Sequence, residues 1–132
     1  MKTDDDRLLE AATNARRNAY APYSKYAVGA ALADEVGRVH TGCNVENAAF
    51  PEGTCAEAIA IGAMVAAGGR RIAAIAIAGG REDLEPCTPC GGCRQKIAEF
   101  ADASTRILLL DADGTFKACG IDDLLPDSFR LL

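Results

Sequence analysis

The 132-residue sequence contains no tryptophan, one histidine, and only seven phenylalanines and tyrosines. With so few aromatic rings, the chain offers few platforms on which the bases of a nucleic acid could stack. The net charge is −5, and the lysines and arginines are scattered rather than gathered along one face, which argues against binding a phosphate backbone. No apolar run approaches the roughly 18 residues that a membrane-spanning helix needs. We therefore expect neither nucleic-acid binding nor membrane insertion.

The single histidine also limits which catalytic mechanisms the chain can use. His40 is the only one, so no histidine is to spare for a Ser-His or Cys-His nucleophile. On its predicted strand we expect it to be a surface residue rather than a metal ligand. The first residues, Met1 to Asp6, lack an apolar segment behind a basic start, so no signal peptide is predicted. We expect a cytoplasmic protein in which the six cysteines serve metal binding rather than disulfides.

The pattern of apolar residues predicts an alternation of helices and strands. Helices are predicted over 4–20, 54–67, 91–101 and 121–125, and strands over 26–33, 36–43, 72–78, 106–110 and 115–119. Strand–helix–strand units need crossover connections, so part of the sheet should be parallel. No repeat or linker divides the chain. We expect one α/β layered domain over 1–132, long enough to bury its own core.

Three cysteines have the spacing of a catalytic metal site: Cys55, and Cys90 with Cys93 in Pro-Cys-Gly-Gly-Cys. Thiolates bind zinc strongly, and three protein ligands leave the fourth tetrahedral position open for a water. Cys87 also fits Pro-Cys-x-x-Cys with Cys90, but Gly91 and Gly92 favour the pair Cys90 and Cys93, because glycines allow a close turn at a helix start. The alternatives are buried small hydrophobic residues, or a structural four-thiolate site completed by Cys43 or Cys87.

Glu57, two residues after Cys55, can be interpreted in two ways. Thr54 and Glu57 fit a capping box, with Thr54 as the N-cap of the following helix. A carboxylate in this position can also shuttle protons for a metal-bound water, and a metal ligand, any residue and Glu, followed by Pro-Cys-x-x-Cys, is the pattern of zinc-dependent nucleobase deaminases. Beside three metal-spaced cysteines, the proton shuttle is the favoured interpretation.

The loop Asn44-Val45-Glu46-Asn47 follows a predicted strand and carries amide and carboxylate groups. Such a loop can be an ordinary turn, but these groups also suit the hydroxyls of a sugar.

With these residues in place, the chain resembles the small zinc-dependent cytidine deaminases nearly from end to end. Five ordered blocks carry the resemblance: 23–30 (YSKYAVGA), 42–48 (GCNVENA), 55–57 (CAE), 89–95 (PCGGCRQ) and 124–126 (LLP). The resemblance implies a three-layer α/β/α sandwich around a five-stranded mixed sheet. The stretch 55–62, with Asp113-Gly114 and Gly120-Ile121, is also similar to the blasticidin S deaminases.

The resemblance also implies roles for residues. One zinc per subunit would be bound by Cys55, Cys90 and Cys93, with Glu57 as the catalytic proton shuttle. Substrate would be contacted by Asn44 and Glu46 at the ribose, by Tyr26, where the family usually has Phe, by Ala56, and by Phe129, which would enter a neighbouring subunit's pocket in a homotetramer. The family commonly has an Arg after Cys-Ala-Glu that donates to a zinc thiolate; this chain has Ala58 there, which leaves Arg94 for that role.

We therefore expect an enzyme of pyrimidine salvage that deaminates cytidine and deoxycytidine by a zinc-activated water. Two alternatives stay open at this point. One is deamination of a modified cytosine nucleoside such as blasticidin S, and the other is a non-catalytic zinc-binding interaction domain, in which Glu57 and the Asn44 to Asn47 loop would be coincidences.

Overall fold

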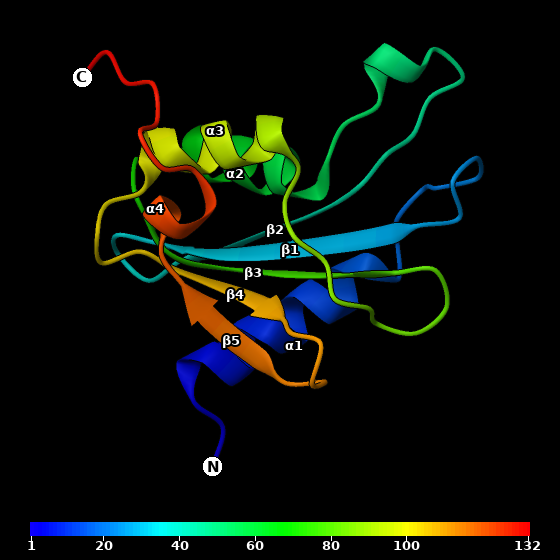
Figure 1. Cartoon of the computed structure of the whole chain (residues 1–132), viewed down its shortest axis with the longest axis horizontal. Coiled ribbons are helices and arrows are strands. Elements are labelled where there is room, and N and C mark those ends of the chain that lie inside the picture. Colours follow the sequence, from blue (N-terminus) through cyan, green and yellow to red (C-terminus); the bar gives the residue numbers. More distant parts are fainter.

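A computed structural model describes residues 1–132. Its centre is a mixed five-stranded sheet in the order β2-β1-β3-β4-β5 (Figure 1). The strands are β1 (Ala27–Asp34), β2 (Val39–Cys43), β3 (Ile72–Gly80), β4 (Arg106–Leu110) and β5 (Phe116–Cys119). Only β3 and β4 are parallel, and a helix connects them, as the crossover rule predicts.

The helices are α1 (Asp4–Arg16), α2 (Ala56–Ala66), α3 (Gly91–Phe100) and α4 (Ile121–Leu124). Figure 1 shows α1 below the sheet and α2 and α3 above it, which makes three layers. Alternate residues of β3 serve the two faces, because successive side chains of a strand point in opposite directions. Ile75 and Ile77 join the core beneath α2 and α3, whereas Ala74 and Ala76 pack with Leu8 of α1. The expected α/β/α sandwich is confirmed.

The α1 side of the sheet is lined with small residues, so the helix lies very close to the strands. A Cβ on Gly29 of β1 would lie 2.0 Å from the carbonyl oxygen of Ala12 and 2.4 Å from the backbone nitrogen of Arg16. The absence of a side chain at Gly29 therefore sets how closely α1 approaches β1.

Several predicted boundaries were wrong. The strand predicted over 36–43 begins at Val39, because residues 35–37 form the turn, and the strand predicted over 72–78 continues to Gly80. Two helix boundaries were also wrong. The first helix ends at Arg16 rather than at Tyr20, because the backbone of Tyr20 instead pairs with the loop residue Val45. The second begins after Thr54, whose backbone exchanges two hydrogen bonds of 2.9 Å with Val45. Both changes come from pairing between segments distant in sequence, which no local pattern reports.

The turn between β1 and β2 contains a buried carboxylate. Asp34 accepts hydrogen bonds from His40 Nε2 at 2.9 Å and from Arg38 Nε at 2.8 Å, and the backbone N–H groups of Val36 and Arg38 donate to its other oxygen. Burial by itself would raise the pKa of Asp34, but these donors together hold it well below its usual range. His40 is thus bonded to Asp34 and its side chain is only 10% exposed, so the expectation of a surface residue was wrong; the potential metal cluster consists of the three cysteines and does not include it.

None of the helices combines the length and the apolar character needed to cross a bilayer.

Candidate zinc and substrate site

Two helix starts bring three thiols together. Cys55 is the N-cap of α2, Cys90 is the N-cap of α3, and Cys93 lies in the first turn of α3. Their sulfur atoms all lie within 4.8 Å of one another, with 3.9 Å between those of Cys55 and Cys90. Two sulfurs at Zn–S distances of about 2.3 Å in a tetrahedron would be about 3.8 Å apart. The cluster therefore fits a zinc ion in both donor type and spacing.

The surroundings of the cluster affect negative charge on the sulfurs in two opposing ways. The N-termini of α2 and α3 both point to it, and their partial positive charges oppose the one net negative charge that three thiolates and Zn²⁺ carry. The backbone N–H of Cys93 lowers the pKa of Cys90, so this thiol deprotonates most readily. Burial raises the pKa of Cys55 and of Cys93, and the nearby Glu57 carboxylate adds to the effect on Cys93. A dication is the natural compensation for that penalty.

Glu57 lies beside the cluster in the first turn of α2 and is 4% exposed. Burial raises the pKa of its carboxyl, because the charged form loses solvation. The capping-box interpretation is wrong: Cys55 rather than Thr54 is the N-cap, and no side chain caps this helix start. Helix capping therefore does not explain why this carboxyl is buried beside three thiols.

A cavity of about 190 Å³ opens in front of the cluster. The reactive groups of this cavity come from Glu57, Cys55 and Cys90. The other residues that line it are Tyr26, Val28, Asn44, Ala56, Cys87 and Thr88. Sequence reasoning missed Val28 and Thr88, although both lie inside or next to the blocks that carried the resemblance. Burial raises the pKa of Tyr26 to about 12, so its hydroxyl stays protonated and can donate.

Asn44 hydrogen-bonds to the backbone of the cavity wall. Its Oδ1 accepts from the N–H of Val28 at 2.9 Å, and its Nδ2 donates to the carbonyl oxygen of Tyr26 at 2.8 Å. The amide therefore holds the start of β1 while one side of it lines the cavity.

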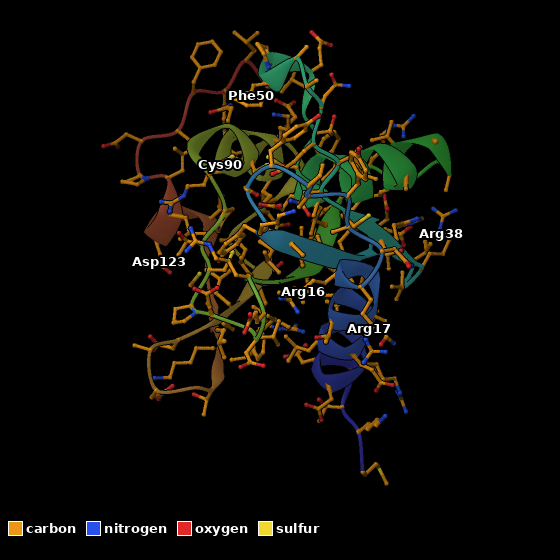
Figure 2. All side chains as sticks on the ribbon, turned by 90° about the vertical axis from the view of Figure 1, so that its right-hand side faces the viewer. Arg16, Arg17, Arg38, Phe50, Cys90 and Asp123 are labelled. Atoms are coloured by element: carbon orange, nitrogen blue, oxygen red, sulfur yellow. The ribbon has the colours of Figure 1, made fainter.

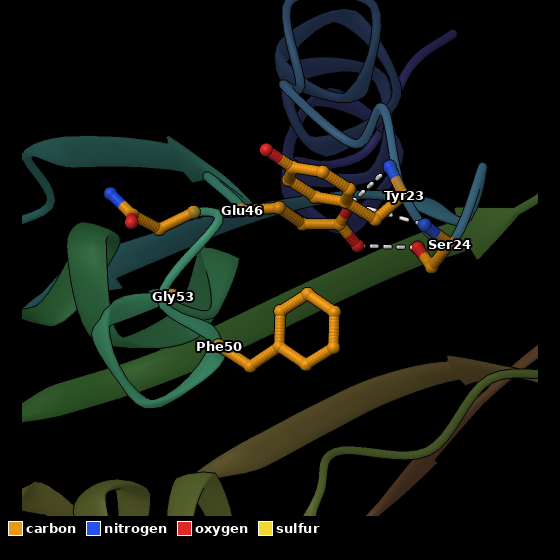
Figure 3. Close-up of a pocket in the computed structure, with 6 residues that line it drawn as sticks. Tyr23, Ser24, Glu46, Phe50 and Gly53 are labelled. Carbon is orange, nitrogen blue, oxygen red and sulfur yellow. Dashed lines mark hydrogen bonds between the residues drawn. The ribbon is translucent and has the colours of Figure 1, made fainter.

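Glu46 lies in a second hollow, of about 390 Å³ (Figure 3). Its carboxylate accepts from the backbone N–H groups of Tyr23, at 2.9 Å, and Ser24, at 3.2 Å, and from the hydroxyl of Ser24. The Ser24 hydroxyl is the main reason that the pKa of Glu46 is lowered. Phe50 meets Tyr23 edge to face, with ring centroids 5.8 Å apart, and is largely exposed. The structure does not bring Glu46 into the cavity that Asn44 lines.

The remaining candidate residues lie around the cluster. Cys87 lines the cavity but is not among the three clustered thiols. Arg94 does not donate to a sulfur in this structure; its Nε and Nη1 donate to the carbonyl oxygens of Pro89, at 2.8 Å, and Leu124, at 2.9 Å, which ties the start of α3 to α4. Phe129 lies in the C-terminal segment and is 69% exposed. The side-chain amide of Gln95 donates a hydrogen bond to the carbonyl oxygen of Phe129 at 3.0 Å, which holds this segment against α3.

Comparisons with known proteins agree with this geometry. Residues 2–109 match the family model of the cytidine and deoxycytidylate deaminase zinc-binding region. A cytidine deaminase of Sporosarcina psychrophila is 40% identical over 126 residues, which cover 96% of this chain and 91% of that protein. A cytidine deaminase of Mycobacterium tuberculosis is 42% identical over 120 residues, covering 91% and 85%.

Solved structures give the same result for the fold. The crystal structure of cytidine deaminase from Mycobacterium tuberculosis aligns with a TM-score of 0.82 and 39% identity, covering 98% of this chain and 100% of the other. That of cytidine deaminase from Burkholderia pseudomallei aligns with a TM-score of 0.83 and 44% identity, covering 93% and 97%. The similarity extends over almost the whole of each chain.

Proposed function

The chain belongs to the cytidine and deoxycytidylate deaminase family, and from this premise we propose that it hydrolyses cytidine and deoxycytidine to uridine and deoxyuridine, with release of ammonia. The observation that carries the proposal is the meeting of three thiols and the buried Glu57 carboxyl at one cavity. A zinc-binding domain without catalysis would need the thiols but not a carboxyl that is buried at a cost beside them.

Cys55, Cys90 and Cys93 hold one zinc per chain in this proposal. When bound, zinc supplies a Lewis acid that lets water react as a nucleophile near neutral pH. Glu57 would take a proton from a water in the cavity and deliver it to the ring nitrogen, while the water oxygen forms a bond to carbon 4 of the pyrimidine. Glu57 would then take the second proton from the hydroxyl now on carbon 4 and deliver it to the amine, so that the carbon–nitrogen bond breaks, the carbonyl forms and ammonia leaves. Its raised pKa suits a group that must accept and return protons in turn.

The rest of the cavity binds the nucleoside. Tyr26 and Ala56 contact the base, and Asn44 holds the ribose hydroxyl together with Glu46, which reaches it from the neighbouring hollow. The Glu46 carboxylate accepts hydrogen bonds from Tyr23 and Ser24 in the unliganded chain. To bind a ribose hydroxyl, the carboxylate must therefore give up some of these bonds or accept the hydroxyl in addition to them.

Neighbouring chains complete the site in this proposal. Phe129 is exposed on the C-terminal segment, and Phe50 with Tyr23 exposes a second aromatic surface beside Glu46. A homotetramer would cover these rings and place Phe129 in an adjacent pocket. We further propose that the protein acts in pyrimidine salvage in the cytoplasm, where its six unpaired cysteines would stay reduced.

Loss of cytidine absorbance, together with ammonia release, tests the proposed function. We expect the zinc-loaded protein to convert cytidine and deoxycytidine, a chelator to abolish the conversion, and added zinc to restore it. Blasticidin S serves as the comparison substrate. Zinc-loaded protein that converts neither cytidine nor deoxycytidine would contradict the proposal.

A further inference from the structure

Arg16 joins three backbone segments at one end of the sheet. It lies in the last turn of α1, on the side of the sheet opposite to α2 and α3, next to the exposed Arg17 (Figure 2). Its Nε donates to the carbonyl oxygen of Ala27 at 3.0 Å, and its Nη2 donates to those of Gly80 at 2.7 Å and Glu82 at 3.0 Å. These acceptors belong to the start of β1, the end of β3 and the loop that follows β3.

The close packing of α1 gives the arginine its place. Because Gly29 has no side chain, the backbone of Arg16 lies against β1, and a Cβ on Gly29 would come within 2.4 Å of the Arg16 nitrogen. From this position the planar guanidinium can reach carbonyl groups on both neighbouring strands, since its donors are set in a fixed fork.

The segments that Arg16 bonds carry one wall of the substrate cavity. Ala27 lies between Tyr26 and Val28, which both line the cavity, and the loop that begins at Gly80 leads to Cys87, another lining residue. The two segments meet over Gly79, where an added Cβ would lie 2.8 Å from the sulfur of Cys87 and 3.1 Å from the Tyr26 ring. The position of this wall therefore depends on how the start of β1 and the loop after β3 are held.

The start of β1 is held from two sides. On the cavity side Asn44 bonds the Tyr26 carbonyl and the Val28 N–H, and on the α1 side Arg16 bonds the Ala27 carbonyl between them. The loop is held by the backbone bond from Glu85 to Gly79, by the bond from the Arg81 N–H to the Glu85 carboxylate, and by Leu84 and Cys87, which pack against the two hydrophobic cores. Arg16 thus hydrogen-bonds both the start of β1 and the first residues of this loop, and so fixes the two segments relative to each other.

From this geometry we infer that Arg16 is a positioning residue for the deaminase reaction, resting on the function proposed above. It touches neither the thiol cluster nor the cavity. It acts by holding Tyr26 and Cys87 at a fixed separation from the cluster, so that the nucleoside is bound with its base in place. A misplacement of about 1 Å in such a wall can lower turnover of substrate about 100-fold.

Substitutions of Arg16 and Arg17 test this inference. Arg16→Met keeps most of the aliphatic stem and removes all three bonds. Arg16→Lys retains a charged donor that can reach the Gly80 and Glu82 carbonyls but has no second nitrogen for Ala27. Arg17→Met is the matched control, because Arg17 is exposed and its side chain makes no hydrogen bond or ion pair. Zinc content, cytidine kinetics and amide hydrogen exchange are measured for each variant.

We expect Arg16→Met to raise the KM for cytidine about tenfold or more, with one zinc per chain retained, and amide exchange to accelerate over residues 79–88 while α2 and α3 keep their protection. Arg16→Lys should lie between Arg16→Met and the wild type, and Arg17→Met should match the wild type.

Three outcomes would overturn the inference: a KM within twofold of wild type for Arg16→Met, an equal effect of Arg17→Met, or uniformly faster exchange with parallel loss of zinc. If Arg16→Met does not fold, Arg16→Lys decides, and wild-type kinetics with wild-type exchange over 79–88 would refute the positioning role. An inactive wild-type protein would instead contradict the proposed function, and the local exchange would then decide the role of Arg16 by itself.

Discussion

Gly42 of β2 lies beneath α2, and the structure predicts that a single added methyl group there will move α2, the helix that carries Glu57. A Cβ at Gly42 would lie 2.5 Å from the carbonyl oxygen of Ala56, 2.7 Å from the nitrogen of Ala60 and 2.9 Å from the Cβ of Ile59. Two of these atoms are backbone, so no rotamer change relieves the contact. To open the shortest distance to 3.4 Å, α2 must retreat by about 0.9 Å.

The expected cost of Gly42→Ala has two parts. Overpacking of this kind lowers the free energy of unfolding by about 1–3 kcal/mol. The same displacement moves the first turn of α2, which carries Glu57, and the N-cap Cys55 relative to the start of α3. Since a shift of about 1 Å in reacting groups can cost about 100-fold in rate, turnover should fall far more than stability alone would explain.

Gly62→Ala is the control on the same helix. Gly62 is exposed and has nothing within 4 Å of an added Cβ, so alanine there should stabilise α2 by about 0.5–1 kcal/mol and leave turnover unchanged. Denaturant unfolding and cytidine kinetics are measured on both zinc-loaded variants. Wild-type stability and turnover in Gly42→Ala would refute the argument that Gly42 sets the position of α2.

The other substitutions separate the roles of individual side chains. Cys90→Ala should lose zinc and all turnover whereas Cys87→Ala keeps zinc, and metal analysis that gives the reverse would overturn the ligand assignment. Glu46→Gln should leave zinc content unchanged but raise the KM for cytidine at least tenfold, because a site that pairs a hydroxyl is penalised when its partner changes; unchanged kinetics would remove Glu46 from the ribose site. Asp34→Asn should lower Tm at neutral pH, and the loss should shrink as pH falls below about 4, where the unfolded-state carboxyl of Asp34 becomes protonated and the stabilisation from its depressed native pKa is progressively lost. A Tm difference that does not change with pH would contradict this account of Asp34.

Much of the fold follows from local sequence, because each strand and helix satisfies its own pattern. The strand Arg106–Leu110 was predicted with the same boundaries as the structure, since it is a short apolar run between polar turns. The helix starts at Cys55 and Cys90 were also expected, within one or two residues, and they bring the thiols together as predicted.

The errors in the helix boundaries and in the placement of Glu46 share one physical cause, which is pairing between distant segments. Val45 pairs with both Tyr20 and Thr54, and these bridges shorten α1, displace the expected N-cap and lead the chain away from the cavity after Asn44. For this reason Glu46 lies in a different hollow from Asn44, although only Val45 separates them in sequence. Arg16 could not be recognised at all, because its acceptors are backbone carbonyl oxygens, which carry no sequence signature.

Glu57→Gln tests the central claim most directly, namely that a buried carboxyl beside a three-thiolate zinc site transfers the protons of cytidine deamination. The amide preserves the size of the side chain in its buried position, but it cannot accept and return a proton. We measure zinc content, Tm and the rate of ammonia release from cytidine for the wild type and for Glu57→Gln. The account predicts one zinc per chain and a folded protein in both, with turnover reduced by about 100- to 10,000-fold in the variant. A zinc-loaded Glu57→Gln protein whose turnover stays within tenfold of the wild type would contradict it.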